Sequence, residues 1–185
     1  MNIYPNDIII SLYHKNTQMS IISVLGVCYN ILMRDFEKIS FKQFKKDVAD
    51  DRDLYDSIII PQRSSEATAG YDLPLLSDLT LKPGETVKLP TGLKAHFQPD
   101  EVLLLIVRSK TGFKYNIRLC NQVGVIDSDY YNNPDNEGHL FIKVQNEDTE
   151  THSFKRGDAL VQGVFMKFLT TESDDNLGKD RRSEY

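Results

Sequence analysis

An apolar run near the middle of the chain ends abruptly in two acids and an aromatic ring. The segment reads Gly124-Val-Ile-Asp-Ser-Asp-Tyr130. Because Asp127 directly follows apolar residues, we expect its carboxylate at the edge of a partly desolvated pocket, where a base that activates water would be placed. Alternatively, Asp127 and Asp129 are ordinary turn residues. The segment makes Asp127 a candidate general base.

A second polar cluster follows the apolar run Val102–Val107 and reads Arg108-Ser-Lys-Thr-Gly-Phe-Lys114. A buried strand that ends in this way brings a hydroxyl, several cations and a flexible backbone to one spot. That combination suits an anion such as a phosphate. A plain surface turn is the alternative.

Two shorter segments add one polar side chain each. In Ala69-Gly-Tyr-Asp-Leu73 a carboxylate follows a glycine at the start of a candidate strand. In Arg156-Gly-Asp-Ala-Leu-Val-Gln162 a turn leads into a strand that carries one amide. Taken singly, the first segment is more typical of a turn than of a site.

Short strands separated by turns must position these residues. Turn signals rich in Gly, Pro, Asn and Asp recur about every ten residues between Lys82 and Asp158. Between them the apolar patterns predict strands at Thr86–Leu89, Leu93–Phe97, Val102–Val107, Leu140–Gln145 and Ala159–Phe168. The continuous run Val102–Val107 predicts a strand buried on both faces. This pattern of short strands and frequent turns indicates an all-β sandwich, jelly roll or small barrel. Only the segment Phe36–Val48 is compatible with either a strand or a helix.

The chain divides into three unequal parts: an extension at 1–33, a β domain at 34–170 and a polar arm at 171–185. The extension contains only two charged side chains, Asp7 and Lys15. Its apolar stretch does not fit a secretory signal peptide, because the region before it is barely basic and no small-x-small cleavage site follows. We expect a short packed helix or a poorly ordered arm there, with Met33 as an alternative natural start.

Composition excludes several classes of protein. The 185 residues carry 22 Lys and Arg against 27 Asp and Glu, a net charge of −5, which argues against a general nucleic-acid or membrane-surface binder. No apolar run reaches the ~18 residues of a spanning helix. The two cysteines and four histidines are dispersed, so we expect unpaired thiols in a reducing, cytoplasmic setting and no zinc site.

The four segments, in this order, resemble the motifs of the trimeric dUTPases (deoxyuridine 5′-triphosphate nucleotidohydrolases), over roughly residues 36–170. Gly124–Tyr130 matches that family's third motif nearly letter for letter, and Tyr131–Glu137 resembles an insertion found in one branch. The resemblance implies an all-β subunit with a distorted jelly-roll, or β-clip, fold of eight strands. It further implies a homotrimer whose three active sites lie between subunits.

The resemblance also implies roles at the nucleoside end. Asp127 would orient and deprotonate the attacking water and hold the ribose 3′-hydroxyl. Tyr130 would lie against deoxyribose and leave no room for a 2′-hydroxyl. Asn121 would belong to a hairpin that reads the uracil edge through main-chain groups, together with Gly124, Val125 and Ile126.

At the phosphate end, Ser109 would donate to an oxygen between the α- and β-phosphates, while Arg108 and Gln162 match phosphate-side or interface contacts. Lys110 and Gly112 belong to the same binding loop. Asp72 would hold a water of a Mg²⁺ ion that sits mainly on the substrate phosphates. The implied reaction is Mg²⁺-dependent hydrolysis of dUTP to dUMP and pyrophosphate, which keeps uracil out of DNA.

Three departures from the family pattern stand out. Lys110 replaces a small residue, and Ala159 replaces the arginine usual in the fourth motif. In the arm, Arg181 and Arg182 would align with a γ-phosphate contact and Tyr185 with a base-stacking ring, but the glycine-rich flap that should follow is missing.

The departures leave two alternatives to the hydrolase. The first is a catalytically weakened, dUTPase-like nucleotide-binding or regulatory protein. The second is a dCTP deaminase, which the sequence disfavours because Lys143 stands near the place where deaminases carry a glutamate.

Overall fold

The structure is a computed structural model and describes residues 20–22, 28–30 and 34–172. The chain falls into two units, Met1–Met33 and Arg34–Tyr185. In the first unit, β1 (Ser20–Ile22) pairs antiparallel with β2 (Cys28–Asn30). The expectation of a packed helix in 1–33 is therefore wrong for these six residues, which are rich in strand-forming types.

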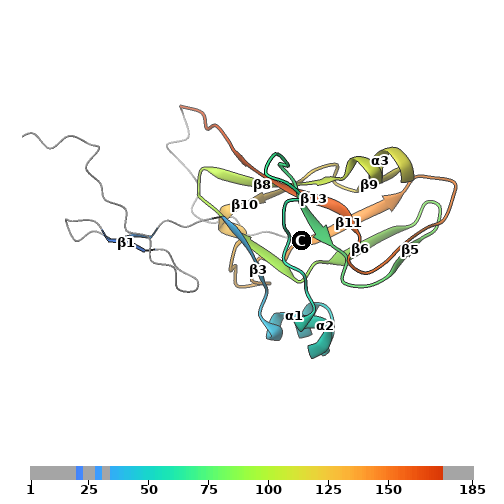
Figure 1. The fold of residues 1–185 in the computed structure, drawn as a ribbon, viewed down its shortest axis with the longest axis horizontal. Helices are drawn as coiled ribbons and strands as arrows, with labels where there is room; N and C mark the ends of the chain where they lie inside the picture. Colours follow the sequence, from blue (N-terminus) through green and yellow to red (C-terminus); the bar gives the residue numbers. More distant parts are fainter. Residues whose placement is uncertain (1–19, 23–27, 31–33, 173–185) are drawn as a thin grey trace, which may run out of the picture. The chain divides into compact units, whose positions relative to one another are not determined.

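The second unit consists of short strands with three small helices (Figure 1). In chain order its elements are β3 (Asp35–Lys38), α1 (Phe41–Asp47), α2 (Arg52–Asp56), β4 (Tyr71–Pro74), β5 (Leu79–Leu81), β6 (Thr86–Pro90), β7 (Leu93–His96), β8 (Glu101–Val107), α3 (Ser109–Tyr115), β9 (Ile117–Leu119), β10 (Gly124–Asp127), the 3₁₀ turn η1 (Ser128–Tyr130), β11 (Phe141–Asn146), β12 (His152–Phe154) and β13 (Ala159–Lys167).

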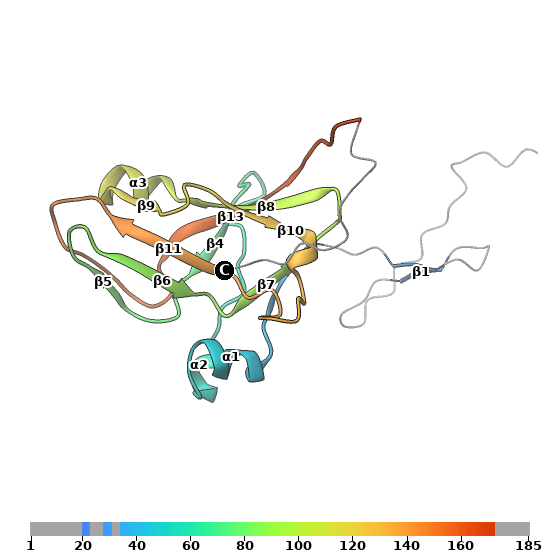
Figure 2. The same ribbon diagram turned by 180° about the vertical axis from the view of Figure 1, so that it is seen from behind.

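The strands form two main sheets that enclose the core. One sheet has the order β10-β8-β13-β4 and the other β6-β11-β9, while β12-β5 and β3-β7 are two-stranded. The reverse view shows β8, β10 and β13 along one side of the unit and β5, β6 and β11 along the other (Figure 2). Leu103, Leu105 and Val161 of the first sheet and Ile142 and Val144 of the second are almost fully buried. Alternation along each strand therefore turns one face of each sheet inward.

The outer face of the four-stranded sheet is only partly covered within this chain. On β8, Leu104 and Ile106 are half-buried, whereas Leu103 and Leu105 on the inner face are buried. The prediction that Val102–Val107 is buried on both faces is therefore wrong for the single chain. No second layer of the described residues packs on that side.

Two local expectations also differ from the structure. The polar segment after β8 is not a simple turn, because Ser109–Tyr115 forms the helix α3. The segment around Asn121 is not a hairpin, because β9 pairs with β11 and β10 pairs with β8. Residues 120–123 therefore connect the two main sheets. Sequence periodicity does not give the partners of β9 and β10, because these depend on which strand becomes the neighbour.

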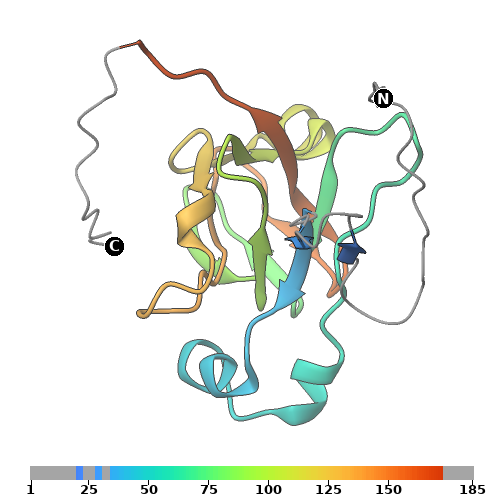
Figure 3. The ribbon, with the colours of Figure 1, turned by 90° about the vertical axis from the view of Figure 1, so that its left-hand side faces the viewer.

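The segment Phe36–Val48, left open by its pattern, contains the strand β3 followed by α1. The Ser40 side chain caps α1 by accepting a hydrogen bond from the Gln43 amide at 3.1 Å. Figure 3 shows β3 running down into α1. The orange loop that follows η1 lies to the left of β3 in this view.

Two side-chain contacts tie α1 to the end of that loop. Glu137 accepts hydrogen bonds from the Ser40 amide at 2.9 Å and from the Ser40 hydroxyl at 2.6 Å. At the other end of α1, Asp47 Oδ2 lies 2.7 Å from His139 Nδ1. His139 Nε2 accepts from the Gly92 amide at 2.9 Å, so the proton of the neutral ring is on Nδ1 and is donated to Asp47.

The buried pair favours a neutral His139 and an ionised Asp47. Burial lowers the pKa of His139 below its usual value, although the nearby Asp47 carboxylate opposes the shift. The pKa of Asp47 is also lowered; burial opposes this shift, but hydrogen bonds from Gln43 and His139 outweigh it. Between the lowered pKa of His139 and its ordinary value near 6.5, the unfolded chain binds more protons than the folded chain, so stability falls as the pH falls through that window.

We therefore expect the free energy of unfolding to decrease when the pH is lowered below about 6.5. His139→Gln should make this decrease shallower, because glutamine has no proton to gain. Denaturant unfolding at a series of pH values and one fixed protein concentration measures both slopes. Equal pH dependence in the two proteins would show that the buried histidine does not set the acid sensitivity.

Candidate active site

One end of the four-stranded sheet collects polar side chains from three strands. Asp72 on β4 lies directly opposite Gln162 on β13, and Val161 of β13 lies opposite Val107, the last residue of β8. Arg108, Ser109 and Lys110 follow β8 immediately. We call Asp72, Arg108, Ser109, Lys110 and Gln162 the strand-end cluster; three separate sequence segments thus meet at one edge.

Arg108 holds the strand-end cluster together. Its Nε lies 3.0 Å from Asp72 Oδ1, and its Nη1 donates to the Ala159 carbonyl at 3.0 Å. Its main-chain amide donates to the Leu160 carbonyl at 3.0 Å. Position 159 therefore contributes a main-chain oxygen to this contact, which any residue type supplies, including the alanine that departs from the expected arginine.

The strand-end cluster lines a hollow of about 220 Å³. Ser64, Thr68 and Gly70 complete its lining, and sequence reasoning did not select these three as site residues. The run of hydroxyl residues at 64–68, directly before the first motif, was the available signal. Within the described part of the chain the Ser109 hydroxyl makes no hydrogen bond, so it is available to a ligand in the hollow.

Gly70 is required by the position of Gln162. A Cβ atom added at residue 70 would lie 2.0 Å from Gln162 Oε1 and 2.8 Å from its Cδ. No side chain can occupy that space while Gln162 keeps its present conformation. The glycine of the first motif therefore allows the amide to lie across the edge of the hollow.

A second group of predicted residues lies along β10, which we call the β10 cluster: Gly124, Val125, Ile126, Asp127 and Tyr130. Asp127 ends β10 and lies opposite Val102, at the far end of β8 from Arg108. Its side chain is half-buried, as is Tyr130 in the following 3₁₀ turn. Asn121 is exposed in the connection before β10, and Gly112 lies in α3 beside the strand-end cluster.

Asp127 and Gln162 lie on the same face of the sheet, but they are far apart. Gln162 is aligned with Ile106 on β8, and Asp127 with Val102. Four residues along β8 and two strand spacings separate them, which corresponds to about 17 Å. A single chain therefore does not bring Asp127 to the strand-end cluster.

Apolar side chains lie on the outer face between Asp127 and Gln162. Val125, Leu104 and Val164 form one row across three strands, and Met166 lies beside it. Val125 is 60% exposed and Met166 50% exposed. Leu104 and Val164 are half-buried. Exposed apolar side chains grouped in this way are typical of surfaces that bind another protein surface.

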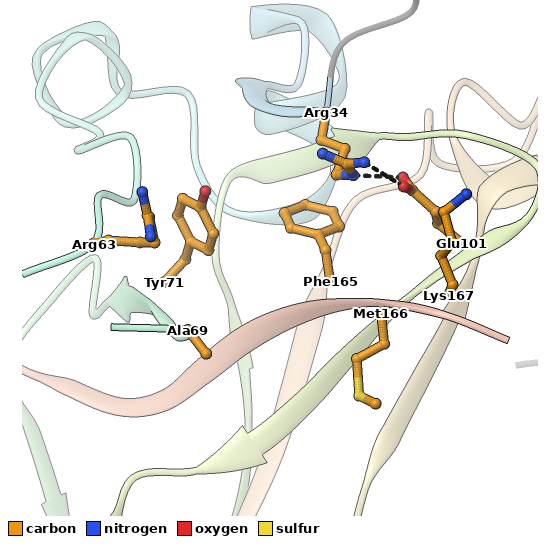
Figure 4. Close-up of a pocket in the computed structure, with 8 residues that line it drawn as sticks. All are labelled: Arg34, Arg63, Ala69, Tyr71, Glu101, Phe165, Met166 and Lys167. Carbon is orange, nitrogen blue, oxygen red and sulfur yellow. Dashed lines mark hydrogen bonds and ion pairs between the residues drawn. The ribbon is translucent and has the colours of Figure 1, made fainter. Parts of the chain in front are cut away.

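A larger hollow of about 310 Å³ lies near the other end of β13 (Figure 4). Its cations already have partners among the described residues. Arg34 Nε donates to Glu101 Oε2 at 2.7 Å, Arg63 donates to two main-chain carbonyls, and Lys167 donates to Asp100 at 2.7 Å. Glu101 is nearly buried, and its hydrogen bond with Arg34 holds the pKa of its carboxyl below the usual value.

The smaller hollow is thus the better anion site, since Ser109 and Lys110 are exposed there. In residues 34–172, no group of three or more acidic, histidine or cysteine side chains is arranged to hold a metal ion. Asp72 is the acid of the strand-end cluster, so a cation there would take most of its ligands from a bound anion. Such an arrangement fits Mg²⁺ bound chiefly through phosphate oxygens.

The remaining predicted residues fall elsewhere. Arg181, Arg182 and Tyr185 lie outside the described residues. Lys143, noted because deaminases carry an acid near it, is exposed on β11 and pairs with Lys88 of β6. Among residues 20–22, 28–30 and 34–172, no helix has the length and apolar character of a membrane span.

Comparison with known proteins gives a consistent result. The dUTPase family model matches residues 56–184. A deoxyuridine 5′-triphosphate nucleotidohydrolase of Lactococcus lactis is 48% identical over 126 residues, which are 68% of this chain and 84% of that protein. A homologue from Shewanella piezotolerans with the same name is 37% identical over 116 residues, 61% of this chain and 72% of that protein.

Solved structures agree. The dUTPase of Streptococcus mutans is 40% identical, with a TM-score of 0.62 over 75% of this chain and 99% of that one. The dUTPase of Staphylococcus aureus phage phi11, at 20% identity and a TM-score of 0.58, covers 82% of this chain and 99% of that one and supports the fold alone. The predicted all-β fold and dUTP-hydrolysing activity are confirmed: this chain belongs to the dUTPase family of deoxyuridine 5′-triphosphate nucleotidohydrolases.

Proposed function

We propose that the chain hydrolyses dUTP in a site shared between subunits of a homotrimer, with Asp127 as the general base. The observation that carries this proposal is the separation of the two clusters. Asp127 and Gln162 lie on one sheet face, about 17 Å apart, with apolar side chains between them. Packing these faces around a threefold axis buries the apolar rows and can bring Asp127 of one copy to the strand-end cluster of another.

In this proposal the strand-end cluster binds the triphosphate. Ser109 donates its hydroxyl to an oxygen between the α- and β-phosphates, and Lys110 adds positive charge beside it. Gln162 contacts the phosphates or the neighbouring subunit. The Arg108–Asp72 pair fixes the edge of the hollow, and local cations offset the net acidity of the chain.

The β10 cluster binds the nucleoside. Asn121 and the main-chain groups of Gly124, Val125 and Ile126 read the uracil edge, and Tyr130 lies against deoxyribose. Asp127 takes a proton from water as the water oxygen bonds to the α-phosphorus. The bond to the bridging oxygen then breaks, which gives dUMP and pyrophosphate. Positioning and electrostatics carry the rate without a covalent intermediate.

Asp72 would hold Mg²⁺ through a water molecule while substrate phosphates supply most ligands. Bound there, the ion supplies charge neutralisation and a fixed triphosphate geometry. Arg181, Arg182 and Tyr185 of the arm would contact the γ-phosphate and the base. We place the protein in the cytoplasm, where removal of dUTP keeps uracil out of DNA.

Asp127→Asn should lower pyrophosphate release from dUTP by about a thousandfold, because it removes the base with little change in volume. Binding of dUTP should change little. Asp129→Asn is the matched control. Asp129 is an exposed acid two residues after Asp127, so this variant should retain activity. Undiminished turnover by Asp127→Asn would refute the assignment, and tight dUTP binding without turnover by the unmodified chain would indicate a nucleotide-binding protein instead.

Gly70→Ala should weaken turnover at low dUTP concentration, because the added methyl group displaces the Gln162 amide. The midpoint of thermal unfolding should change little, since the displaced atoms are the end of a flexible side chain. In a Gln162→Ala background the same substitution should have no further effect on kcat/KM. An equal loss in both backgrounds would show that Gly70 acts independently of Gln162.

Mixing two inactive variants tests the shared site. One variant carries Asp127→Asn, and the other carries Ser109→Ala with Gln162→Ala. After joint unfolding and refolding at equal amounts, random threefold assembly leaves about one quarter of the sites complete. Pyrophosphate release should then recover to about that fraction of the unmodified rate, whereas a site contained in one chain would show no recovery.

A further inference from the structure

The loop Tyr131–Glu137 and the residues that follow it hold the phenol of Tyr130 in place. The Tyr130 hydroxyl donates to the His139 carbonyl at 3.2 Å and accepts from Asn136 Nδ2 at 2.7 Å. Asn133 Nδ2 donates to the Tyr130 carbonyl at 2.8 Å. The ring is therefore fixed at its hydroxyl end by two partners that come after it in the chain.

The amide of Asn136 has one orientation that satisfies its neighbours. Its Oδ1 accepts from the Gly138 amide at 3.0 Å and from Asn133 Nδ2 at 2.9 Å. With the oxygen turned toward these two donors, the NH₂ group faces the Tyr130 hydroxyl. Asn136 thus donates to the phenol from a fixed position.

The backbone around Asn136 is itself fixed. Glu137 and His139 are held by the two ends of α1 through Ser40 and Asp47. Between them, Gly138 has φ +80°, and a Cβ there would lie 2.6 Å from the Tyr130 carbonyl oxygen. The His139 carbonyl and the Asn136 amide, the two hydrogen-bond partners of the Tyr130 hydroxyl, therefore both belong to a segment that α1 holds in place.

We infer that Asn136 is a positioning residue that sets the preference for deoxyribose over ribose by acting through Tyr130. This inference rests on the proposed role of Tyr130 against the sugar. A ring that excludes a 2′-hydroxyl by contact works only while it cannot move aside. Loss of the hydrogen bond from Asn136 frees the hydroxyl end of the ring, so that the ring can make room for ribose.

The test compares kcat/KM for dUTP and UTP in four proteins: the unmodified chain, Asn136→Ala, Tyr130→Phe, and the double variant. Asn136→Ala should lower the dUTP/UTP preference about fivefold, the effect of one lost hydrogen bond to a hydroxyl. Tyr130→Phe should lower it similarly, because the ring remains but both contacts are lost. The double variant should match Tyr130→Phe, since the two changes remove the same interaction.

Asp135→Ala is the matched control. Asp135 adjoins Asn136 and is exposed, whereas the Tyr130 hydroxyl bonds to Asn136 and His139, so the preference should stay unchanged. Tyr130→Phe covers the case in which Asn136→Ala fails to fold. It removes the same hydrogen bond from the side of the ring and leaves the Asn136 contacts to Gly138 and Asn133 intact.

Unchanged preference in Asn136→Ala and in Tyr130→Phe, or equal losses from Asn136→Ala with and without the Tyr130 hydroxyl, would overturn the inference. A second measurement separates this result from failure of the proposed function. The ratio of dissociation constants for UMP and dUMP reports sugar discrimination without turnover, and Asn136→Ala should lower it by a similar factor. Absence of pyrophosphate release from dUTP by the unmodified chain would instead contradict the proposed hydrolysis and leave the binding ratio to decide the role of Asn136.

Discussion

The alignment of β13 between β8 and β4 is the constraint on which both clusters depend. It places Gln162 opposite Asp72 on one side and Ile106 on the other. Because side chains alternate along a strand, a shift of one residue would turn Gln162 into the core and Val161 out to solvent. The burial of Val161, Leu103 and Leu105 disfavours that shift. Hydrophobic packing on the inner face therefore fixes the chemistry presented on the outer face.

The outer face explains why one chain carries two separated groups of polar residues. Exposed Val125 and Met166 lie on the intervening surface, and burying them against another copy would release water from apolar area. The same association would join complementary clusters from different copies, so assembly and completion of the site would share one surface.

The elements outside the main sheets also bear on the site. α1 is a short helix, but its two ends hold Glu137 and His139. The buried His139 is neutral because its burial outweighs the attraction of Asp47. A polar contact of this kind is strong only while every partner remains in place. The segment that holds Tyr130 therefore depends on residues nearly a hundred positions earlier in the chain.

The sequence by itself determined the motifs, most of the strands and the family, because strand periodicity, turn residues and motif spacing are local properties. It selected Asp72, Arg108, Ser109 and Gln162 as candidates, and the fold brings these four together around one hollow; their roles stay predictions. It did not select Gly70 or the hydroxyls at 64 and 68. It left the segment of α3 open between a binding loop and a surface turn, and it predicted a hairpin at Val123–Ile126. Only the tertiary structure decided those points and the distance between Asp127 and the strand-end cluster, because strand partners and register follow from burial of the whole core.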